Sequence, residues 1–243
     1  MPELLFYQQP VALNKEIHRN LKIGTQPVNF NFAASTNSVM LAGGEFSEAA
    51  KEYPILFVRV GERIAPVALL GFRDAENLFV SQDGTWDARY IPAFVRCYPF
   101  VLASGGNAAG EMTVCIDAAF SGFTTTGEGA ALMDEQGEPT QVLQNAIKFL
   151  QEFQNQVRRT EIFVNRLNDM ELFVEMTAQS ELGNGQRFAM QGLLAVDEKK
   201  LLELNKTKGL ELFRSGELSW VYAHLLSLSN IGRLGDRLTR RMV

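Results

Sequence analysis

Residues that could bind phosphate or act as nucleophiles do not form a recognised catalytic motif. Gly122 and Gly127 have the spacing of a P-loop, but Glu128 stands where a lysine would have to reach the phosphates. The glycine-rich stretch 105–110 lacks the Gly-x-Gly-x-x-Gly spacing and precedes a predicted strand instead of a helix. No serine lies in a Gly-x-Ser-x-Gly elbow. We therefore name no catalytic residue and favour a protein that is not an enzyme.

The two histidines, His18 and His224, are the natural candidates for a general base or a metal ligand. They lie far apart in the sequence, and neither belongs to a metal-binding pattern, so we expect no metal site and no cofactor. The acidic residues within 133–140 lack the spacing of a calcium loop and indicate a solvated hairpin. His224 borders the apolar face of a predicted helix. We interpret it as bonded to a neighbouring element, and a catalytic base is the alternative.

The densest group of interaction-prone side chains lies between residues 77 and 100. Trp, Tyr and Arg are frequent at binding hot spots, because they combine a large rigid area with a polar end. An arginine there could also bind a carboxylate of a partner through two hydrogen bonds. The candidate binding residues are Asn77, Trp86, Tyr90, Arg96, Tyr98 and Phe100. The alternative is a core element in which the aromatic rings pack internally and Arg96 pairs within the chain.

The C-terminal stretch 233–243 carries four arginines against the single acidic residue Asp236. We expect a frayed, charged end. Contact of these arginines with an acidic partner or a lipid surface is the alternative.

Composition restricts the class of protein. The chain has 243 residues, of which 46% are hydrophobic and 21% charged, so it can bury a large core without disulfides or metals. Its net charge of −5 argues against broad nucleic-acid binding, which needs a cationic face. No apolar run approaches the ~18 residues of a membrane span, and the first residues do not resemble a signal peptide. We expect a soluble cytoplasmic protein, in which Cys97 and Cys115 are reduced thiols rather than one disulfide.

The first half of the chain favours strands. Residues 53–60 and 66–72 resemble an antiparallel pair, and 100–103 resembles a partner of 112–117 across Gly105 and Gly106. Between these pairs, the Asp-Gly dipeptide at 83–84 predicts a tight turn, since glycine readily adopts a positive φ.

The second half favours helices. Apolar residues at three- and four-residue spacing predict a helix from Thr140 to 157, and 161–175 begins like a helix and ends like a strand. A hairpin turn at 183–185, a helix capped by Asp197 and an amphipathic helix over 217–229 follow. Strands followed by helices indicate an α+β fold, with a largely antiparallel, strand-rich N-terminal half packed against C-terminal helices. We expect a single domain over 1–243.

Many of these stretches occur in the same order in a known family. Each short motif is common by itself, and the ordered set is specific. Over residues 18–228 the chain resembles the SapC family of bacterial proteins. The motifs that carry this resemblance lie at 44–46, 53–57, 68–71, 77–79, 86, 90–93, 96–100, 134–140, 196–201, 216–218 and 222–227.

The resemblance implies an accessory role. The family takes its name from a member associated with a bacterial surface layer. The resemblance also implies that such proteins occur beside TonB-dependent receptors and beside halogenase-like or cupin-like oxygenases. It supplies no catalytic residues. Its aromatic and arginine block falls on Tyr90, Pro92, Arg96, Tyr98 and Phe100, while Cys97 stands where a basic residue would be expected.

We therefore expect a non-enzymatic accessory or adaptor protein that binds a protein or peptide partner, with a link to outer-surface or TonB-dependent uptake systems. The alternative is an enzyme or an oxygenase-associated subunit that acts on a polypeptide or a small organic ligand. A structural component of a surface layer is a third, weaker interpretation.

Overall fold

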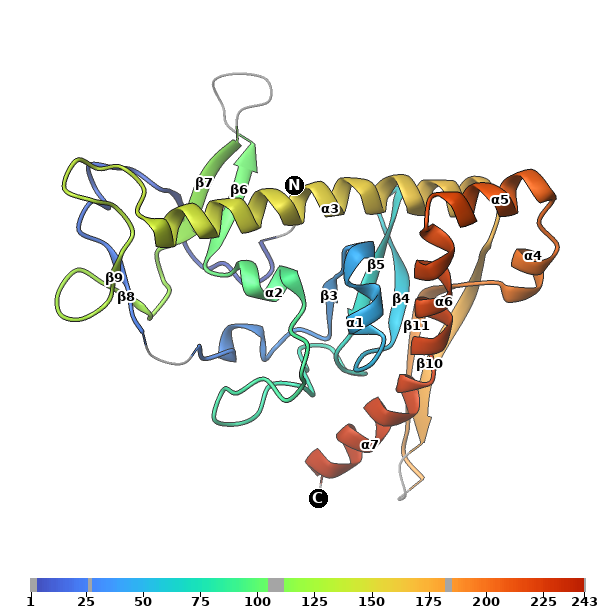
Figure 1. Ribbon diagram of the computed structural model, residues 1–243. Coiled ribbons are helices and arrows are strands. Elements are labelled where there is room, and N and C mark those ends of the chain that lie inside the picture. Colours follow the sequence, from blue (N-terminus) through green and yellow to red (C-terminus); the bar gives the residue numbers. More distant parts are fainter. Residues whose placement is uncertain (1–3, 26–27, 105–111, 182–184, 243) are drawn as a thin grey trace. The chain divides into compact units, whose positions relative to one another are not determined.

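Three antiparallel sheets are present in the computed structural model, which describes residues 4–25, 28–104, 112–181 and 185–242 (Figure 1). The chain forms two compact units. The first unit comprises Met1–Val28 and Arg96–Asn155, and the second comprises Asn29–Val95 and Gln156–Val243. Each unit therefore combines segments that are distant in the sequence.

The first unit contains two small sheets, ordered β1-β7-β6 and β8-β2-β9. Their strands are β1 (Pro10–Ala12), β2 (Lys22–Ile23), β6 (Phe100–Ser104), β7 (Met112–Asp117), β8 (Phe123–Thr124) and β9 (Ala130–Ala131). Phe100, Ile116, Leu132, Leu143 and Leu150 are buried together. The last two come from the first half of helix α3 (Gln141–Asp169), so this helix supplies part of the core of the unit.

The second unit contains a five-stranded sheet, ordered β10-β11-β4-β5-β3. Its strands are β3 (Ser38–Met40), β4 (Ile55–Val60), β5 (Arg63–Leu69), β10 (Phe173–Glu181) and β11 (Arg187–Val196). The central strand β4 pairs with β5 along its whole length, and with β11 only at Leu193–Val58 and Leu194–Phe57. The sheet thus joins strands from both halves of the sequence.

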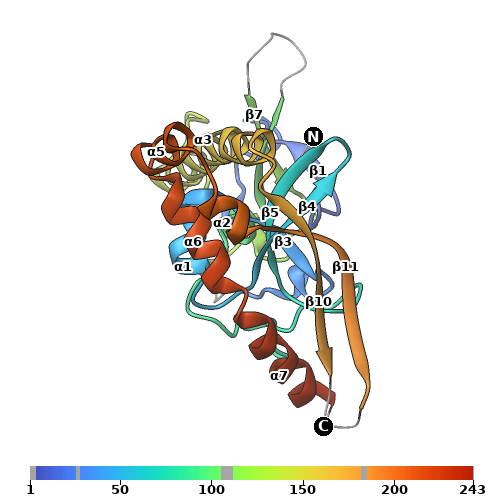
Figure 2. The ribbon, with the colours of Figure 1, turned by 90° about the vertical axis from the view of Figure 1, so that its right-hand side faces the viewer.

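The second unit also contains several helices. They are α1 (Phe46–Ala49), α4 (Glu198–Leu202), α5 (Lys206–Arg214), α6 (Glu217–Ser227) and α7 (Asn230–Met242). The residues of α2 (Ala93–Cys97) are divided between the two units, and the short 3-10 helices are Asn31–Ala33 and Gly43–Glu45. Helix α6 packs against β4 and β11, and α7 packs against β10 (Figure 2). Between helices and sheet, the rings of Phe46, Phe57, Phe163 and Trp220 meet at centroid distances of 5.2–6.4 Å.

The α+β class is confirmed, and so are both predicted strand pairs. The 83–84 turn is also confirmed: Gly84 has φ +82°, and an antiparallel bridge joins Val80 to Trp86 on either side of it. The connections at Gly105, Gly106 and Asn184 lie outside the described residues. The single-domain expectation stays a prediction.

The three predicted helices are present at their expected positions, with one large difference in length, while α1, α2 and α5 were not predicted. Helix α3 begins directly after Thr140 but continues to Asp169, so it includes the helix-like part of 161–175, and β10 begins at Phe173. The Asp197 side chain accepts hydrogen bonds from the N–H groups of Lys199 and Lys200, which confirms it as the cap of α4.

The expectation of a frayed C-terminal end is wrong. Residues Asn230–Met242 form helix α7, in which Leu234 and Leu238 are buried one turn apart. The Asn230 amide also donates hydrogen bonds to the carbonyl oxygens of Ala50 and Tyr53, at 2.7 and 3.1 Å. The helical spacing of the two leucines and the hydrogen bonds of Asn230 therefore stabilise a helix here, in spite of the charge of the four arginines.

Replacing Asn230 with alanine tests the anchor of α7. The variant leaves two carbonyl oxygens without their side-chain donor, so we expect the free energy of unfolding to fall by about 1–3 kcal/mol. Urea denaturation followed by circular dichroism measures this loss. Ser229→Ala, at an exposed neighbouring position, is the matched control. Equal stability of the two variants would contradict the anchor.

Candidate functional site

The structure divides the six candidate binding residues between the two units. Asn77, Trp86 and Tyr90 belong to the second unit, and Arg96, Tyr98 and Phe100 belong to the first. The sequence motif therefore contributes to two local environments.

In the second unit, the polar ends of the aromatic residues point inward. The Trp86 indole N–H donates to the Tyr53 hydroxyl at 2.8 Å, and that hydroxyl donates to the Tyr90 carbonyl oxygen. The Tyr90 hydroxyl donates to the Glu45 carboxylate at 2.7 Å, which also accepts from the Ala93 N–H. The Trp86 and Tyr90 side chains are both half-buried. Their polar groups therefore hold the loop that precedes α2 in place.

The Asn77 side chain is buried and forms hydrogen bonds with the main chain. Its amide donates to the Ala33 carbonyl oxygen at 3.0 Å, and its side-chain oxygen accepts from the Phe79 N–H at 2.9 Å. These bonds connect two loops of the second unit and fix the path of the chain on both sides of residue 77.

In the first unit, Tyr98 bonds a buried carboxylate, and Phe100 belongs to the apolar core. The Tyr98 hydroxyl donates to Asp117 at 3.1 Å, and the N–H groups of Gln8 and Gln9 donate to the same carboxylate. Burial opposes the ionisation of Asp117, but the hydrogen bonds outweigh burial and lower its pKa. Phe100 is buried in the core of the unit.

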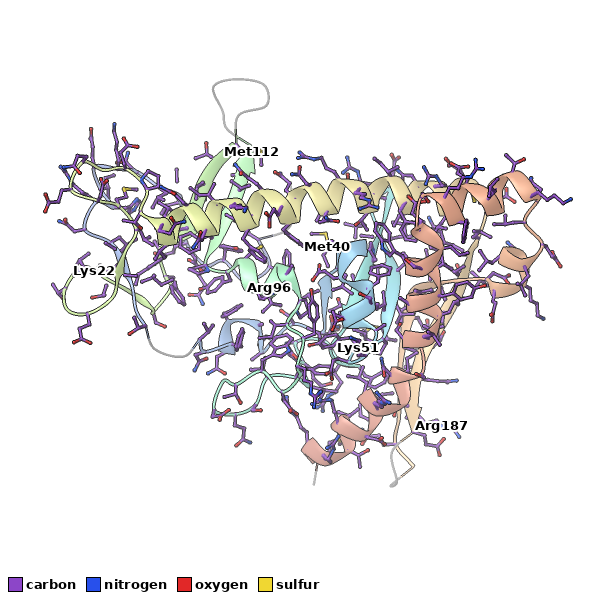
Figure 3. The ribbon with its side chains drawn as sticks, in the orientation of Figure 1. Lys22, Met40, Lys51, Arg96, Met112 and Arg187 are labelled. Carbon is purple, nitrogen blue, oxygen red and sulfur yellow. The ribbon has the colours of Figure 1, made fainter. Side chains whose placement is uncertain are left out.

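Arg96 is the most exposed of the six residues. It projects from α2, where Figure 3 labels it, and its guanidinium lies 4.9 Å from the centroid of the Phe149 ring. A guanidinium can stack on an aromatic ring and bind a carboxylate through its edge at the same time. Of the six residues, Arg96 is the one whose placement best suits contact with a partner.

His224 replaces a missing bond of the sheet. The register of β4 and β11 would pair Ile55 with Val196, two residues beyond the last observed pair. Instead, the imidazole lies between them: Nε2 accepts from the Val196 N–H at 3.0 Å, and Nδ1 lies 2.8 Å from the Ile55 carbonyl oxygen. Since Nε2 is the acceptor, the neutral ring carries its proton on Nδ1 and donates it to Ile55.

This arrangement leaves neither ring nitrogen of His224 for a substrate. The side chain is fully buried, and burial lowers its pKa to about 4, although the bond to Ile55 acts in the opposite direction. The Ser227 hydroxyl completes the junction by accepting from the Ile55 N–H at 2.8 Å.

A pocket of about 420 Å³ lies in the second unit, lined by Ala34, the loop 73–77 and Arg241 of α7. We call it the Glu76 pocket. Arg73 donates from Nε to Glu76 Oε1 at 2.9 Å and forms an ion pair with it. Glu76 Oε2 is buried, and it has no hydrogen-bond partner among the residues that the structure describes. The Glu76 side chain is only 7% exposed.

The shape of this pocket depends on a close approach of the backbone. A Cβ at Gly71 would lie 2.4 Å from the Glu76 carbonyl oxygen, so only glycine allows the loop to fold back at this point. Between Asp74 and Glu76, Ala75 adopts φ +56°, a left-handed conformation that is unfavourable for alanine.

Arginines of α7 complete the surroundings of the pocket. Arg241 donates to the Val80 carbonyl oxygen. Arg237 donates to the Asp87 carbonyl oxygen at 2.8 Å, and its guanidinium lies 4.3 Å from the Phe79 ring centroid. Helix α7 is therefore bonded to the loops on this side of the second unit.

Only one residue of the pocket lining was predicted from the sequence. Asn77 was a candidate binding residue, whereas Arg73 and Glu76 were not, and Arg241 was considered only as part of the charged stretch 233–243. The i,i+3 spacing of Arg73 and Glu76 gave no signal, because that rule applies to helices and these residues lie in a loop. The position of Arg241 depends on α7, which was not expected.

Metal-type clusters and membrane-length helices are both absent from the described residues. No three His, Cys, Asp or Glu side chains within them come together as a metal site requires. In the same part of the chain, no helix has both the length and the apolar character needed to cross a membrane.

The Tyr98→Phe substitution tests the bond to Asp117. It removes one donor from a buried carboxylate, and we expect the free energy of unfolding at neutral pH to fall by about 1 kcal/mol. Urea denaturation measures this change, with Tyr222→Phe at an exposed position as the control. A loss of the same size in both variants would contradict a specific role for the Tyr98 hydroxyl.

The buried His224 predicts a pH dependence of stability. Its pKa is about 4 in the folded protein and near 6.5 when unfolded, so the unfolded chain binds more protons between these values. The contribution of the neutral ring is complete above pH 6.5 and decreases as the pH falls toward 4, by about 3 kcal/mol in total.

Denaturation at a series of pH values measures this loss. His224→Gln, although less stable at pH 7, should lack this component of the slope. His18→Gln, in a loop of the first unit, should retain it. An unchanged slope in His224→Gln would contradict the assignment.

Comparison with known proteins agrees with the motifs in the sequence. No curated protein and no solved structure matches the chain. The family model described as SapC matches residues 13–234, nearly the whole chain and parts of both units. The chain therefore belongs to the SapC family.

Proposed function

We propose that this chain is a non-enzymatic accessory or adaptor protein that binds a protein or peptide partner. The observation that supports it most is the exposure of large apolar side chains on three consecutive helices. Leu202 on α4, Phe213 on α5 and Leu226 on α6 are 72%, 68% and 73% exposed. Burial of exposed apolar side chains is the dominant favourable contribution to most protein–protein association.

Each of these helices already buries another apolar side chain. Leu201, Leu212 and Val221 are buried on α4, α5 and α6. The exposed side chains are therefore not needed for the core, and a partner that covered one of them would gain about 1.5–3 kcal/mol. An apolar segment of a polypeptide fits this requirement.

The family supports an accessory role, because the resemblance implies proximity to outer-surface or TonB-dependent uptake systems and their modifying enzymes. The alternative of an enzyme subunit would use His224 as its base. Since both ring nitrogens of His224 bond the main chain, the geometry favours binding over catalysis.

The test is capture of partners by the tagged full-length protein in its native cells, read by mass spectrometry. The key variant is Phe213→Ser combined with Leu226→Ser. Ile17→Ser, which alters an apolar side chain that is 79% exposed in the first unit, is the matched control. We expect the wild type and the Ile17→Ser control to capture the same partner. The double variant should bind that partner at least about tenfold more weakly than the wild type does.

An Arg96→Ala variant distinguishes the two surfaces. Loss of the partner in Arg96→Ala, with retention in the double variant, would move the binding surface to α2. Absence of any partner that depends on either surface would overturn the adaptor proposal.

A further inference from the structure

Helix α5 carries exposed apolar side chains between two cations. Residues four positions apart lie one above the other on a helix, so Lys206, Leu210 and Arg214 form one stripe along α5, with Phe213 beside it. All four side chains are exposed, whereas Leu212 on the other side of the helix is fully buried. We call the four exposed residues the α5 surface.

The described part of the chain offers the two cations no carboxylate. Within it, neither Lys206 nor Arg214 takes part in an ion pair. The acidic residue of α5, Glu211, lies 3.0 Å from the Arg166 guanidinium and pairs with it instead. The charges of the α5 surface are therefore available to a partner.

The stability of the helix does not explain the cation at its start. The N-terminus of a helix carries a partial positive charge, so acidic side chains are favourable in its first turn and cations are unfavourable. The first turn of α5 contains Lys206 and Lys208 and no acidic residue. Where a sequence breaks such a local preference, a functional requirement is the expected reason. A negatively charged partner would supply that requirement.

The spacing within the α5 surface restricts this partner. Lys206 and Arg214 are separated by two helical turns, or about 12 Å. Leu210 and Phe213 lie between them along the helix. A complementary segment must therefore carry apolar side chains with a carboxylate on either side of them. Opposite charges placed in this way fix the register of a segment while the apolar groups are buried.

We propose that the α5 surface binds an acidic polypeptide segment, whose carboxylates pair with Lys206 and Arg214 and whose apolar side chains cover Leu210 and Phe213. This inference rests on the proposed function and names the chemistry of the partner. An anionic membrane would face a large part of the chain, whose net charge of −5 opposes the approach. A short segment needs to contact only the α5 surface.

Fluorescence anisotropy with the full-length protein tests the proposal. The probe is a labelled helical peptide in which leucines lie between glutamates, and its counterpart has lysines in place of the glutamates. We expect the acidic peptide to bind at least about tenfold more tightly than the basic one, because unlike charges attract and like charges repel across an interface. Added salt should reduce this difference, since it screens exposed charges.

Reversal of the two charges should reverse the preference. In Lys206→Glu combined with Arg214→Glu, the basic peptide should become the tighter ligand. Lys15→Glu combined with Lys148→Glu changes the net charge equally at exposed positions of the first unit, and it should retain the preference for the acidic peptide. Circular dichroism checks that both variants are folded. A purely structural role of Lys206 and Arg214 would not exchange the ligands.

Several results would overturn the proposal. They are the absence of binding by the acidic peptide, equal binding of the two peptides, and an unchanged preference in the folded charge-reversed variant. Binding to vesicles that contain phosphatidylserine, in place of the acidic peptide, would assign the α5 surface to a membrane and would overturn the proposal as well.

Partner capture separates this failure from a failure of the proposed function. A partner that is lost in Phe213→Ser with Leu226→Ser, but retained in the charge-reversed variant, would support the adaptor and overturn the acidic segment. If no captured partner depends on either surface, the adaptor proposal fails. The peptides, measured with the purified protein, then still decide whether the α5 surface binds an acidic segment.

Discussion

The second unit depends on a histidine that takes the place of a strand-to-strand hydrogen bond. Beyond Leu194 and Phe57, strands β11 and β4 no longer pair directly, and the His224 imidazole joins Val196 to Ile55. A neutral imidazole can donate at one nitrogen and accept at the other, so it reproduces both halves of the bond that it replaces. Because this side chain comes from α6, the same contact attaches the helix to the sheet.

Other polar contacts extend from this junction. The Ser227 hydroxyl, one turn after His224, accepts from the Ile55 N–H and donates to the His224 carbonyl oxygen. Three residues later, Asn230 holds two carbonyl oxygens at the start of α7. The position of α7 then allows its arginines to bond the main chain at Val80 and Asp87. The contact of His224 with the sheet thus helps to position α7, whose arginines bond the main chain at Val80 and Asp87.

The elements could be predicted from the sequence because their signals are local. Two apolar runs on either side of a short polar link indicated the β4–β5 pair, and the Asp197 side chain marked the start of α4. Helix α7 was missed because its four arginines suggested a solvated end, although Leu234 and Leu238 have helical spacing. The site residues were harder to predict. Residue type indicates that Trp86 and Tyr90 can bind a partner, but only the fold shows their polar ends bonded to Tyr53 and Glu45.

Buried polar side chains in the described part of this chain are bonded by the chain itself, with one exception. Asp117, His224 and Asn230 are all buried, and each has its hydrogen bonds supplied by the chain itself. Such groups stabilise the fold and leave little for a ligand. Among the described residues, Glu76 Oε2 is the buried side-chain oxygen that lacks this internal supply. The other oxygen of this carboxylate, Oε1, pairs with Arg73, which offsets part of the cost of burying the group.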